Sequence, residues 1–217
     1  MKTDSTGQNF DPDALREKYR LERDKRVRAD GNEQYQAATG TLARYLDDPK
    51  TEEKFERAAL DDSVDVVIVG GGFSGLLAGA RLREAGVESL RVIETGADFG
   101  GTWYWNQYPG AQCDIESYIY LPLLEELGYI PKEKYSYRAE IEAHGRAIGR
   151  HYDLYRNACF RTQVTAMRWD EDAAYWTLST SRDDRIRARF VCMAIGPLSR
   201  PKLPGIPGLD DFGGLHG

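Results

Sequence analysis

The chain has 217 residues, of which 41% are hydrophobic and 29% are charged. These proportions are typical of a globular protein and exclude a fibrous or wholly disordered chain. The net charge of -6 argues against nucleic acid as a partner, because phosphate binding depends on clustered Lys and Arg side chains.

Residues 1–60 are rich in charge and predict a helical N-terminal extension. Asp11 is suited to cap a helix that has Pro12 in its first position. We expect this helix to end at residues 30–32, and a second short helical stretch to cover residues 42–46. A peripheral extension that packs on the following domain is favoured over a functional arm, because apolar positions are few.

The composition changes near residue 64, and the next thirty residues or so predict a complete βαβ unit. Residues 65–69 form a short β-branched run typical of a buried parallel strand. Residues 76–85 repeat apolar side chains at helical spacing and are followed by a glycine that ends the helix. Residues 90–93 form the next strand, which is followed directly by Glu94.

The turn between this first strand and helix reads Gly70-Gly71-Gly72-Phe73-Ser74-Gly75, which fits the pattern GxGxxG. In that pattern Gly70 makes the tight turn, Gly72 admits a pyrophosphate close to the backbone, and Gly75 lets the helix pack on the strand. Glu94 follows about 20 residues on, where a carboxylate holds ribose hydroxyls and disfavours a 2′-phosphate. We favour this role over a solvated carboxylate, so the sequence predicts a site for FAD or NAD.

The rest of the chain predicts a loop, a helix, a β-meander and a connector. Residues 100–114 are a loop dense in Gly, Trp and Tyr, and residues 141–155 have amphipathic helical spacing. Three strands are expected at residues 160–169, 175–180 and 189–195. Residues 197–207 are a connector rich in Pro and Gly.

The loop distinguishes between FAD and NAD. Residues 99–114 read FGGTWYWNQYPGAQCD. Two glycines followed by Thr102 and Trp103 suit a loop that approaches a phosphate or a flat ring. The alternative role of Tyr104 and Trp105 is to form a buried aromatic cluster. The stretch closely resembles the Baeyer-Villiger monooxygenases, in which a GGTWYWNxYPGxxCD loop lies against the flavin. The resemblance runs from about residue 64 to the end of the chain, and the helical extension is similar to that of longer members.

The resemblance implies which residues hold FAD. Beside the three motif glycines, the expected cofactor-binding residues are Phe73, Ser74, Glu94, Gly101, Thr102, Trp103, Gln112, Cys113, Asp114, Tyr120 and the backbone of Val164. The segment ending at Asp114 matches the one that also meets the nicotinamide cofactor near the flavin. Asp114 is therefore the one candidate catalytic residue, and a loop cap is its alternative role.

The resemblance also implies the architecture. We expect an α/β fold: a Rossmann-like FAD-binding domain with a parallel sheet, the GxGxxG βαβ unit and a small antiparallel β-meander. The expected bounds are 1–60 for the helical extension, 61–200 for an incomplete FAD-binding domain, and 201–217 for a linker toward an NADP-binding domain. Ile195 replaces a residue that is usually small and polar. Residues 212–216 are similar to the start of the family fingerprint FxGxxxHxxxW, with His216 two positions early.

For a complete enzyme the resemblance implies FAD and NADPH as cofactors, and a ketone and O2 as substrates that yield an ester or lactone. We expect the chain alone to be inactive, because it contains no second GxGxxG and no constellation of catalytic acid, base or nucleophile. Two alternatives stay open: a flavoprotein that oxygenates nitrogen or sulfur, and a non-catalytic FAD-binding remnant or subunit whose partner chain carries the missing half.

Membrane and metal sites are not indicated. No apolar stretch approaches the roughly 20 residues that cross a bilayer, and the polar start lacks the apolar core of a signal peptide, so we expect a cytoplasmic protein. The three cysteines form no CxxC pair and the three histidines have no metal-ligand spacing. We therefore expect neither a disulfide framework nor a metal site.

Overall fold

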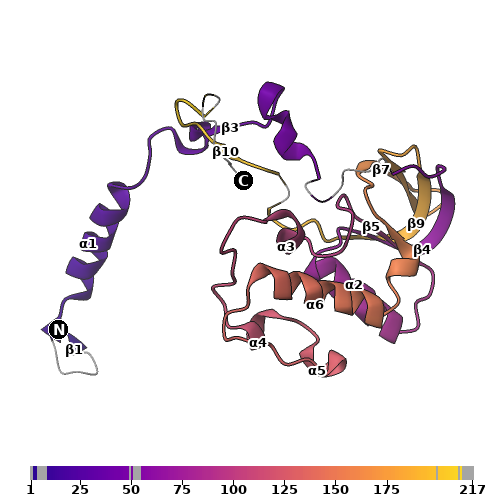
Figure 1. Ribbon diagram of the computed structural model, residues 1–217, viewed down its shortest axis with the longest axis horizontal. Helices are drawn as coiled ribbons and strands as arrows, with labels where there is room; N and C mark the ends of the chain where they lie inside the picture. Colours follow the sequence, from indigo (N-terminus) through magenta and orange to yellow (C-terminus); the bar gives the residue numbers. More distant parts are fainter. Residues whose placement is uncertain are drawn as a thin grey trace. The chain divides into compact units, whose positions relative to one another are not determined.

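The computed structural model describes residues 2–3, 9–48, 50, 55–198, 200–209 and 211. The chain divides into two compact units. One consists of Met1–Tyr45 with Pro201–Gly214, and the other of Leu46–Arg200 with Leu215–Gly217. Figure 1 labels helices and strands of both units.

The smaller unit contains helix α1 (Pro12–Asp24), which follows the short antiparallel pair β1 (Lys2–Thr3) and β2 (Asn9–Phe10). The predicted start of α1 is confirmed: Asp11 accepts hydrogen bonds from the Asp13 and Ala14 amides at 3.0 and 3.4 Å. The predicted end is wrong, because α1 stops before residues 30–32. A separate 3₁₀ turn, η1 (Gly31–Gln34), follows instead. No residue of α1 is buried, and ion pairs one turn apart line its surface.

Residues 197–207, which the sequence predicted to be a connector, contribute a short strand to the same unit. Residues of β10 (Leu203–Pro204) pair antiparallel with β3 (Tyr35–Gln36), and the Gly205 amide donates to the Gln34 carbonyl at 2.8 Å. The second predicted helical stretch is present as a 3₁₀ helix, η2 (Gly40–Leu46). The pairing of β3 with β10 joins segments far apart in the chain, which is why local sequence patterns did not predict it.

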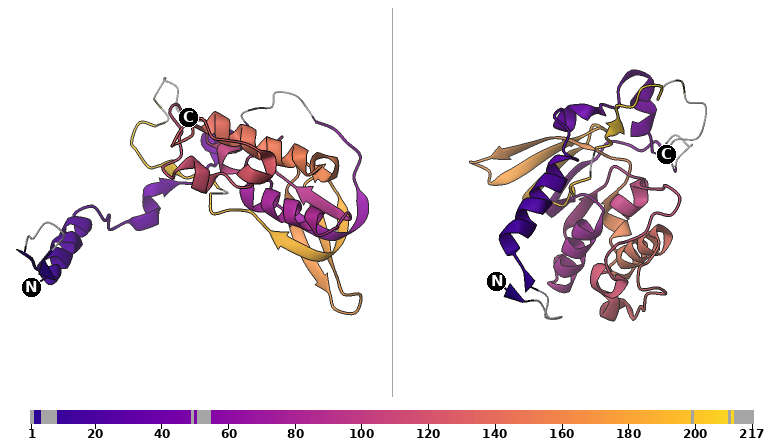
Figure 2. Two further views of the ribbon diagram at one scale, coloured as in Figure 1. Left: turned by 90° about the horizontal axis from the view of Figure 1, so that it is seen from below. Right: turned by 90° about the vertical axis from the view of Figure 1, so that its left-hand side faces the viewer.

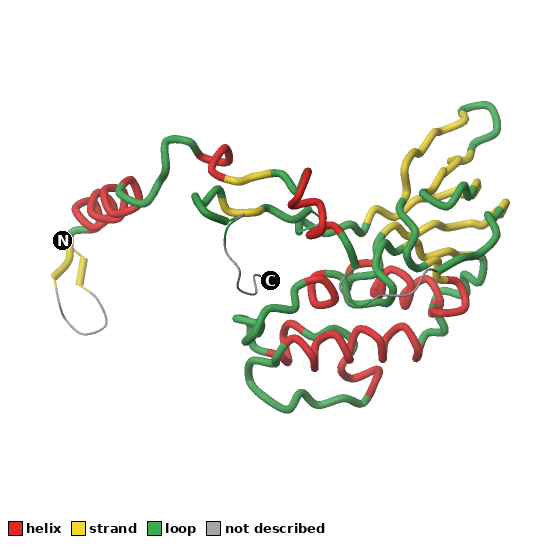
Figure 3. The backbone as a smooth tube through the Cα atoms, turned by 45° about the horizontal axis from the view of Figure 1, so that its top comes forward, coloured by secondary structure: helices red, strands yellow, loops and turns green. Residues whose placement is uncertain are grey.

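The larger unit is built on one six-stranded sheet with the order β6-β5-β4-β9-β8-β7. Its strands are β4 (Asp61–Val69), β5 (Leu90–Ile93), β6 (Ala158–Cys159), β7 (Val164–Asp170), β8 (Tyr175–Thr180) and β9 (Arg185–Met193). The first four strands of that order are parallel, and β9, β8 and β7 form the antiparallel meander. Figure 3 shows the strands in yellow. The predicted α/β class, βαβ unit and meander are confirmed.

Strand bounds differ from the sequence prediction where pairing decides them. The third meander strand was expected to begin at residue 189, but β9 begins at Arg185, which lies opposite Asp61 of β4. β4 likewise begins at Asp61, earlier than the expected residue 65. The two strands pair along nearly their whole length. Charged residues at their starts are therefore part of the sheet, although such residues have low strand propensity. The first meander strand begins at Val164, later than the expected residue 160.

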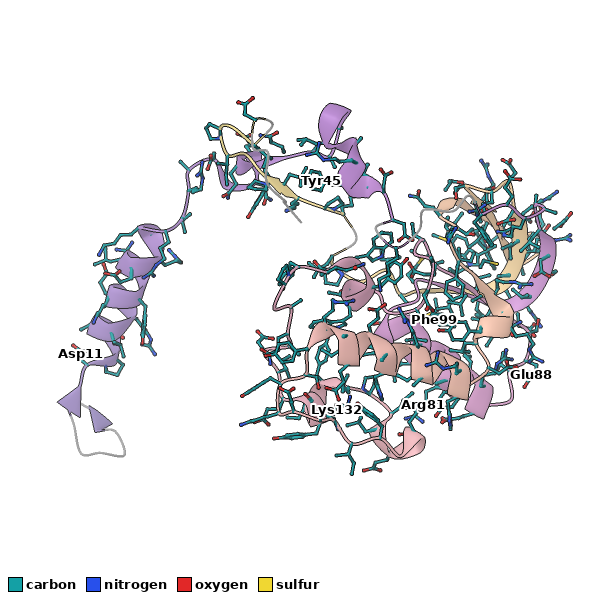
Figure 4. All side chains as sticks on the ribbon, in the orientation of Figure 1. Asp11, Tyr45, Arg81, Glu88, Phe99 and Lys132 are labelled. Carbon is teal, nitrogen blue, oxygen red and sulfur yellow. The ribbon has the colours of Figure 1, made fainter. Side chains whose placement is uncertain are left out.

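Two helices, α2 (Phe73–Glu84) and α6 (Arg138–His151), lie side by side along the sheet (Figure 1, Figure 2). α6 begins three residues before the predicted helix and ends at His151, short of the predicted residue 155. Alternate residues of β4 serve two cores, as strand geometry requires. Ile68 packs in the cluster that includes α2, α6 and Phe99, which is labelled in Figure 4. Val67 packs in a second cluster with residues of the meander.

The same unit contains three single-turn helices: α3 (Thr102–Trp105), α4 (Ser117–Tyr120) and α5 (Leu124–Leu127). A 3₁₀ turn, η3 (Tyr155–Asn157), precedes β6. In the described part of the chain no helix is both long and apolar enough to cross a membrane.

Candidate dinucleotide-binding site

The glycine turn has the geometry that the GxGxxG pattern predicts. Gly70 adopts a φ of +110°, and a Cβ there would lie 2.4 Å from the Ala194 carbonyl oxygen, against the end of β9. A Cβ on Gly75 would lie 1.9 Å from the Gly70 carbonyl oxygen. Side chains at either position would therefore open the turn, and its tightness brings the start of α2 directly to the end of β4.

The N-terminus of α2 lies in this turn. Gly72 is the N-cap residue, and among the described residues no side chain caps the helix. The first amides of a helix have no partner within the helix and carry its positive partial charge. This end of α2 is therefore suited to a phosphate or pyrophosphate group. Phe73 and Ser74 form the first turn of α2, where Ser74 is exposed and Phe73 is half-buried.

Glu94 lies beside the glycine turn. It is 6% exposed, and its carboxylate accepts hydrogen bonds from the Gly71 amide at 2.5 Å and the Gly96 amide at 2.6 Å. Burial raises the pKa of Glu94, and the amides of Gly96 and Gly71 oppose that rise. The Glu94 carboxylate is therefore buried and hydrogen-bonded, and not solvated as the alternative interpretation required. The tertiary fold thus brings Glu94 next to the glycine turn, as the motif requires. The role of Glu94 in binding ribose stays a prediction.

The aromatic loop touches the glycine turn backbone to backbone. The Gly100 amide donates to the Gly71 carbonyl at 3.1 Å. Gly101 has a φ of +54°, and a Cβ there would lie 2.6 Å from the Gly72 Cα atom. Only a residue without a side chain allows this approach. Thr102 then begins α3, so the predicted loop residues are held directly next to the N-terminus of α2.

Three aromatic side chains gather next to this contact. The Trp103 Nε1–H donates to the Tyr120 hydroxyl at 2.8 Å, and the two ring centroids lie 5.8 Å apart, edge to face. The Phe73 ring meets Tyr120 at the same centroid distance. Burial raises the pKa of Tyr120, and the hydrogen bond from Trp103 opposes that rise. The three predicted residues thus form one aromatic cluster.

The segment that precedes α4 is attached behind the cluster. Cys113 is buried and packs with Leu121 and Ile141 next to the three aromatic residues. The Gln112 side chain donates to the Tyr135 carbonyl at 2.6 Å, and Asp114 is exposed. Asp114 is therefore open to solvent beside the cluster, and its catalytic role stays a prediction.

The remaining predicted residues are Val164, Ile195 and His216. Val164, the first residue of β7, packs against the core that contains Val67. Ile195 is 54% exposed, and His216 lies outside the described residues. A separate hollow of about 630 Å³, lined by residues of α5, α6 and the intervening loop, contains none of the predicted site residues.

Sequence reasoning gave no role to residues that stand behind the aromatic loop. Tyr104 is 1% exposed, and its ring meets that of Trp105 edge to face at a centroid distance of 5.2 Å, apart from the Phe73, Trp103 and Tyr120 cluster. Its hydroxyl donates to the carboxylate of Asp48, a residue from the segment before the βαβ unit. Neither Asp48 nor its neighbour Lys50 stands in a recognisable motif, so no local signal pointed to them.

Comparison with known proteins agrees with this geometry. A family model described as an NAD(P)-binding Rossmann-like domain matches residues 68–127. The chain is 56% identical over 205 residues to neopentalenolactone D synthase of Streptomyces avermitilis, covering 94% of this chain and 34% of that protein. It is 50% identical over 210 residues to a Baeyer-Villiger monooxygenase of Streptomyces coelicolor, covering 95% of this chain and 35% of that protein.

Over nearly its whole length the chain is therefore similar to one third of the Baeyer-Villiger monooxygenases. Its fold matches the polycyclic ketone monooxygenase of Thermothelomyces thermophila with a TM-score of 0.79 and 34% identity, over 91% of this chain and 34% of that one. It also matches the OTEMO complex with FAD and NADP, with a TM-score of 0.63 and 32% identity, over 69% of this chain and 29% of that one. The chain spans about a third of the length of the curated relatives.

Proposed function

We propose that this chain supplies the FAD-binding part of an NADPH-dependent flavoprotein monooxygenase, which inserts an oxygen atom next to a ketone carbonyl to give an ester or lactone. The observation that carries the proposal is the backbone contact between Gly72 and Gly101. It joins a generic dinucleotide turn to the aromatic loop that is specific to the family. The names of the relatives favour a ketone over nitrogen or sulfur as the oxygenated centre.

The residues present fit FAD along its length. The amides at the start of α2 would hold the pyrophosphate, and Glu94 would exchange its bonds to the loop amides for bonds to ribose hydroxyls. Thr102 would donate to the cofactor from the start of α3, and Trp103 and Tyr120 would pack beside the flavin. The bound flavin supplies the redox chemistry. The protein's own part is to orient the ring system and to keep water from one side of it.

We assign the nicotinamide and the ketone mainly to the two thirds of the relatives that this chain does not span. The expected division is an extension at 1–60, a FAD-binding domain at 61–200 and a linker at 201–217. Asp114, with Gln112 and Cys113, is placed to form one wall of the nicotinamide site, because this segment packs against the aromatic cluster. Hydride transfer requires the nicotinamide to be held against the flavin, and one wall does not fix that geometry.

The direct test is a titration of the purified chain with FAD, FMN and riboflavin. We expect FAD to bind with a shifted flavin absorption band and quenched fluorescence, and FMN and riboflavin to bind more weakly, because Glu94 and the turn address the adenosine and pyrophosphate. Equal affinity for riboflavin and FAD would contradict the assignment of the turn. No binding of any flavin would refute the proposed function.

A second assay tests whether the nicotinamide and ketone sites lie outside this chain. The chain is incubated with FAD, NADPH and a panel of cyclic, linear and aryl ketones, and NADPH consumption and ester formation are followed together. We expect no ester. Ester formed in proportion to NADPH by this chain alone would show that the nicotinamide and ketone sites lie within it.

A further inference from the structure

The segment that leads into the βαβ unit is fastened to the cofactor loops through Asp48. Both oxygens of its carboxylate lie 2.7 Å from the Tyr104 hydroxyl, and one accepts from the Ala97 amide at 3.1 Å. The Lys50 amide donates to the other oxygen at 3.0 Å. Asp48 therefore bonds to two different parts of the candidate site: α3, which carries Tyr104, and the turn after Glu94, which carries Ala97.

Tyr104 fills the space between those two parts. Its ring lies so close to Gly96 that a Cβ there would be 2.9 Å from a ring carbon, and a Cβ on Gly100 would be 3.0 Å from the Tyr104 Cβ. The Tyr104 hydroxyl also accepts a hydrogen bond from the Ala97 amide at 3.0 Å. The side chain thus spans from the turn that carries Glu94 to the loop that touches Gly72.

A second anchor comes from Lys50. Its ammonium group pairs with Glu142 of α6 and lies 4.5 Å from the centroid of the Tyr104 ring. Glu142 is 4% exposed and also pairs with Arg138 and Arg146. A Cβ on Gly100 would lie 3.3 Å from the Glu142 Cγ atom, so this ion cluster packs against the loop that contains Gly100 and Gly101.

We propose that Asp48 is a positioning residue for FAD binding, which acts through Tyr104 to fix the separation between the Glu94 turn and the Gly101–Trp103 loop. The inference rests on the proposed function, because that function assigns both loops to FAD. A cofactor that contacts both loops at once binds best when their spacing is set before it arrives. Without the Asp48 carboxylate the Tyr104 hydroxyl keeps no acceptor among its described partners, and a buried unsatisfied donor drives the ring to move.

The test compares three variants with the wild-type chain. Asp48→Ala removes the acceptor, Asp48→Asn keeps an acceptor oxygen of the same reach, and Asp47→Ala removes the neighbouring exposed carboxylate. We expect the FAD dissociation constant to rise by roughly tenfold or more in Asp48→Ala, because hydrogen bonds to charged groups have that weight. Asp48→Asn should recover part of the loss, and Asp47→Ala should bind FAD like the wild type. Equal affinities of Asp48→Ala and wild type overturn the proposal.

A double-mutant comparison shows whether the effect passes through Tyr104. Tyr104→Phe removes the hydroxyl and keeps the ring. If Asp48 acts through that hydroxyl, the double variant Asp48→Ala with Tyr104→Phe binds FAD no more weakly than the weaker of the two single variants. Fully additive losses overturn the proposed route.

Amide hydrogen exchange without cofactor separates this inference from the proposed function. In Asp48→Ala we expect faster exchange at residues 96–105 and unchanged exchange in β4 and α2. Unchanged exchange at residues 96–105 overturns the positioning role even if FAD binds. Uniformly faster exchange also overturns it, because it shows a general loss of stability. Failure of the wild-type chain to bind FAD refutes the proposed function instead, and with it the role of Asp48 toward FAD.

Discussion

The contact between Gly101 and Gly72 predicts that alanine at position 101 damages the cofactor site more than the backbone strain alone would. With a φ of +54°, alanine there costs about 1–2 kcal/mol in any environment. Its Cβ would also lie 2.6 Å from the Gly72 Cα, whereas ordinary contacts begin at 3.4 Å, so the two loops must separate by about 0.8 Å.

That separation has a further consequence for the hydrogen bond between the Gly100 amide and the Gly71 carbonyl. The bond is 3.1 Å long, and a shift of this size stretches it beyond hydrogen-bonding distance. Its loss adds about 1 kcal/mol, which gives a total destabilisation of about 2–3 kcal/mol. The pyrophosphate site loses its spacing at the same time, so we expect FAD affinity to fall by at least roughly tenfold.

Gly110 provides a matched control in the same loop. Its φ is +81°, and a Cβ there would meet no atom within 4 Å. Gly110→Ala therefore carries backbone strain without the collision. Urea unfolding followed by circular dichroism gives the free energy of unfolding of both variants without FAD, and quenching of FAD fluorescence gives their affinities. If Gly101→Ala and Gly110→Ala prove equal in both measurements, the two loops are not in the contact described.

Three further predictions concern single residues. Glu94→Ala should weaken FAD binding by about 1.5–3 kcal/mol, the scale of hydrogen bonds to a charged group, and an unchanged dissociation constant would remove Glu94 from the ribose site. Gly72→Val should abolish FAD binding, because its side chain enters the space of the pyrophosphate and presses on Gly101; wild-type flavin occupancy would contradict this. Burial pushes the pKa of Asp184 up, but its pair with Arg57 and its other hydrogen bonds lower it from 3.8 to about 2. Because this folded-state pKa is depressed, Asp184 contributes about 2 kcal/mol of stability above pH ~4 that is lost as the pH falls toward 2, and Asp184→Asn should lack this part of the pH dependence in urea unfolding.

The sequence by itself determined the βαβ unit and the nature of its turn. The β-branched run before Gly70, the helical spacing after Gly75 and the carboxylate at the end of the next strand are all local signals. Each depends on the chemistry of a few neighbouring residues, so each can be read without knowing the partners. The aromatic loop was likewise recognisable, because its residues are contiguous.

Only the tertiary structure decided which distant segments meet. That β9 lies beside β4, and so joins the meander to the parallel sheet, depends on pairing between residues more than 120 positions apart, such as Asp61 and Arg185. The bond of Glu94 to the Gly71 amide, and those of Asp48 to Tyr104, likewise form only because packing brings separate loops together. The exposed Asp47 and the partly buried Asp48 look alike in sequence, since the difference lies in the groups that surround them.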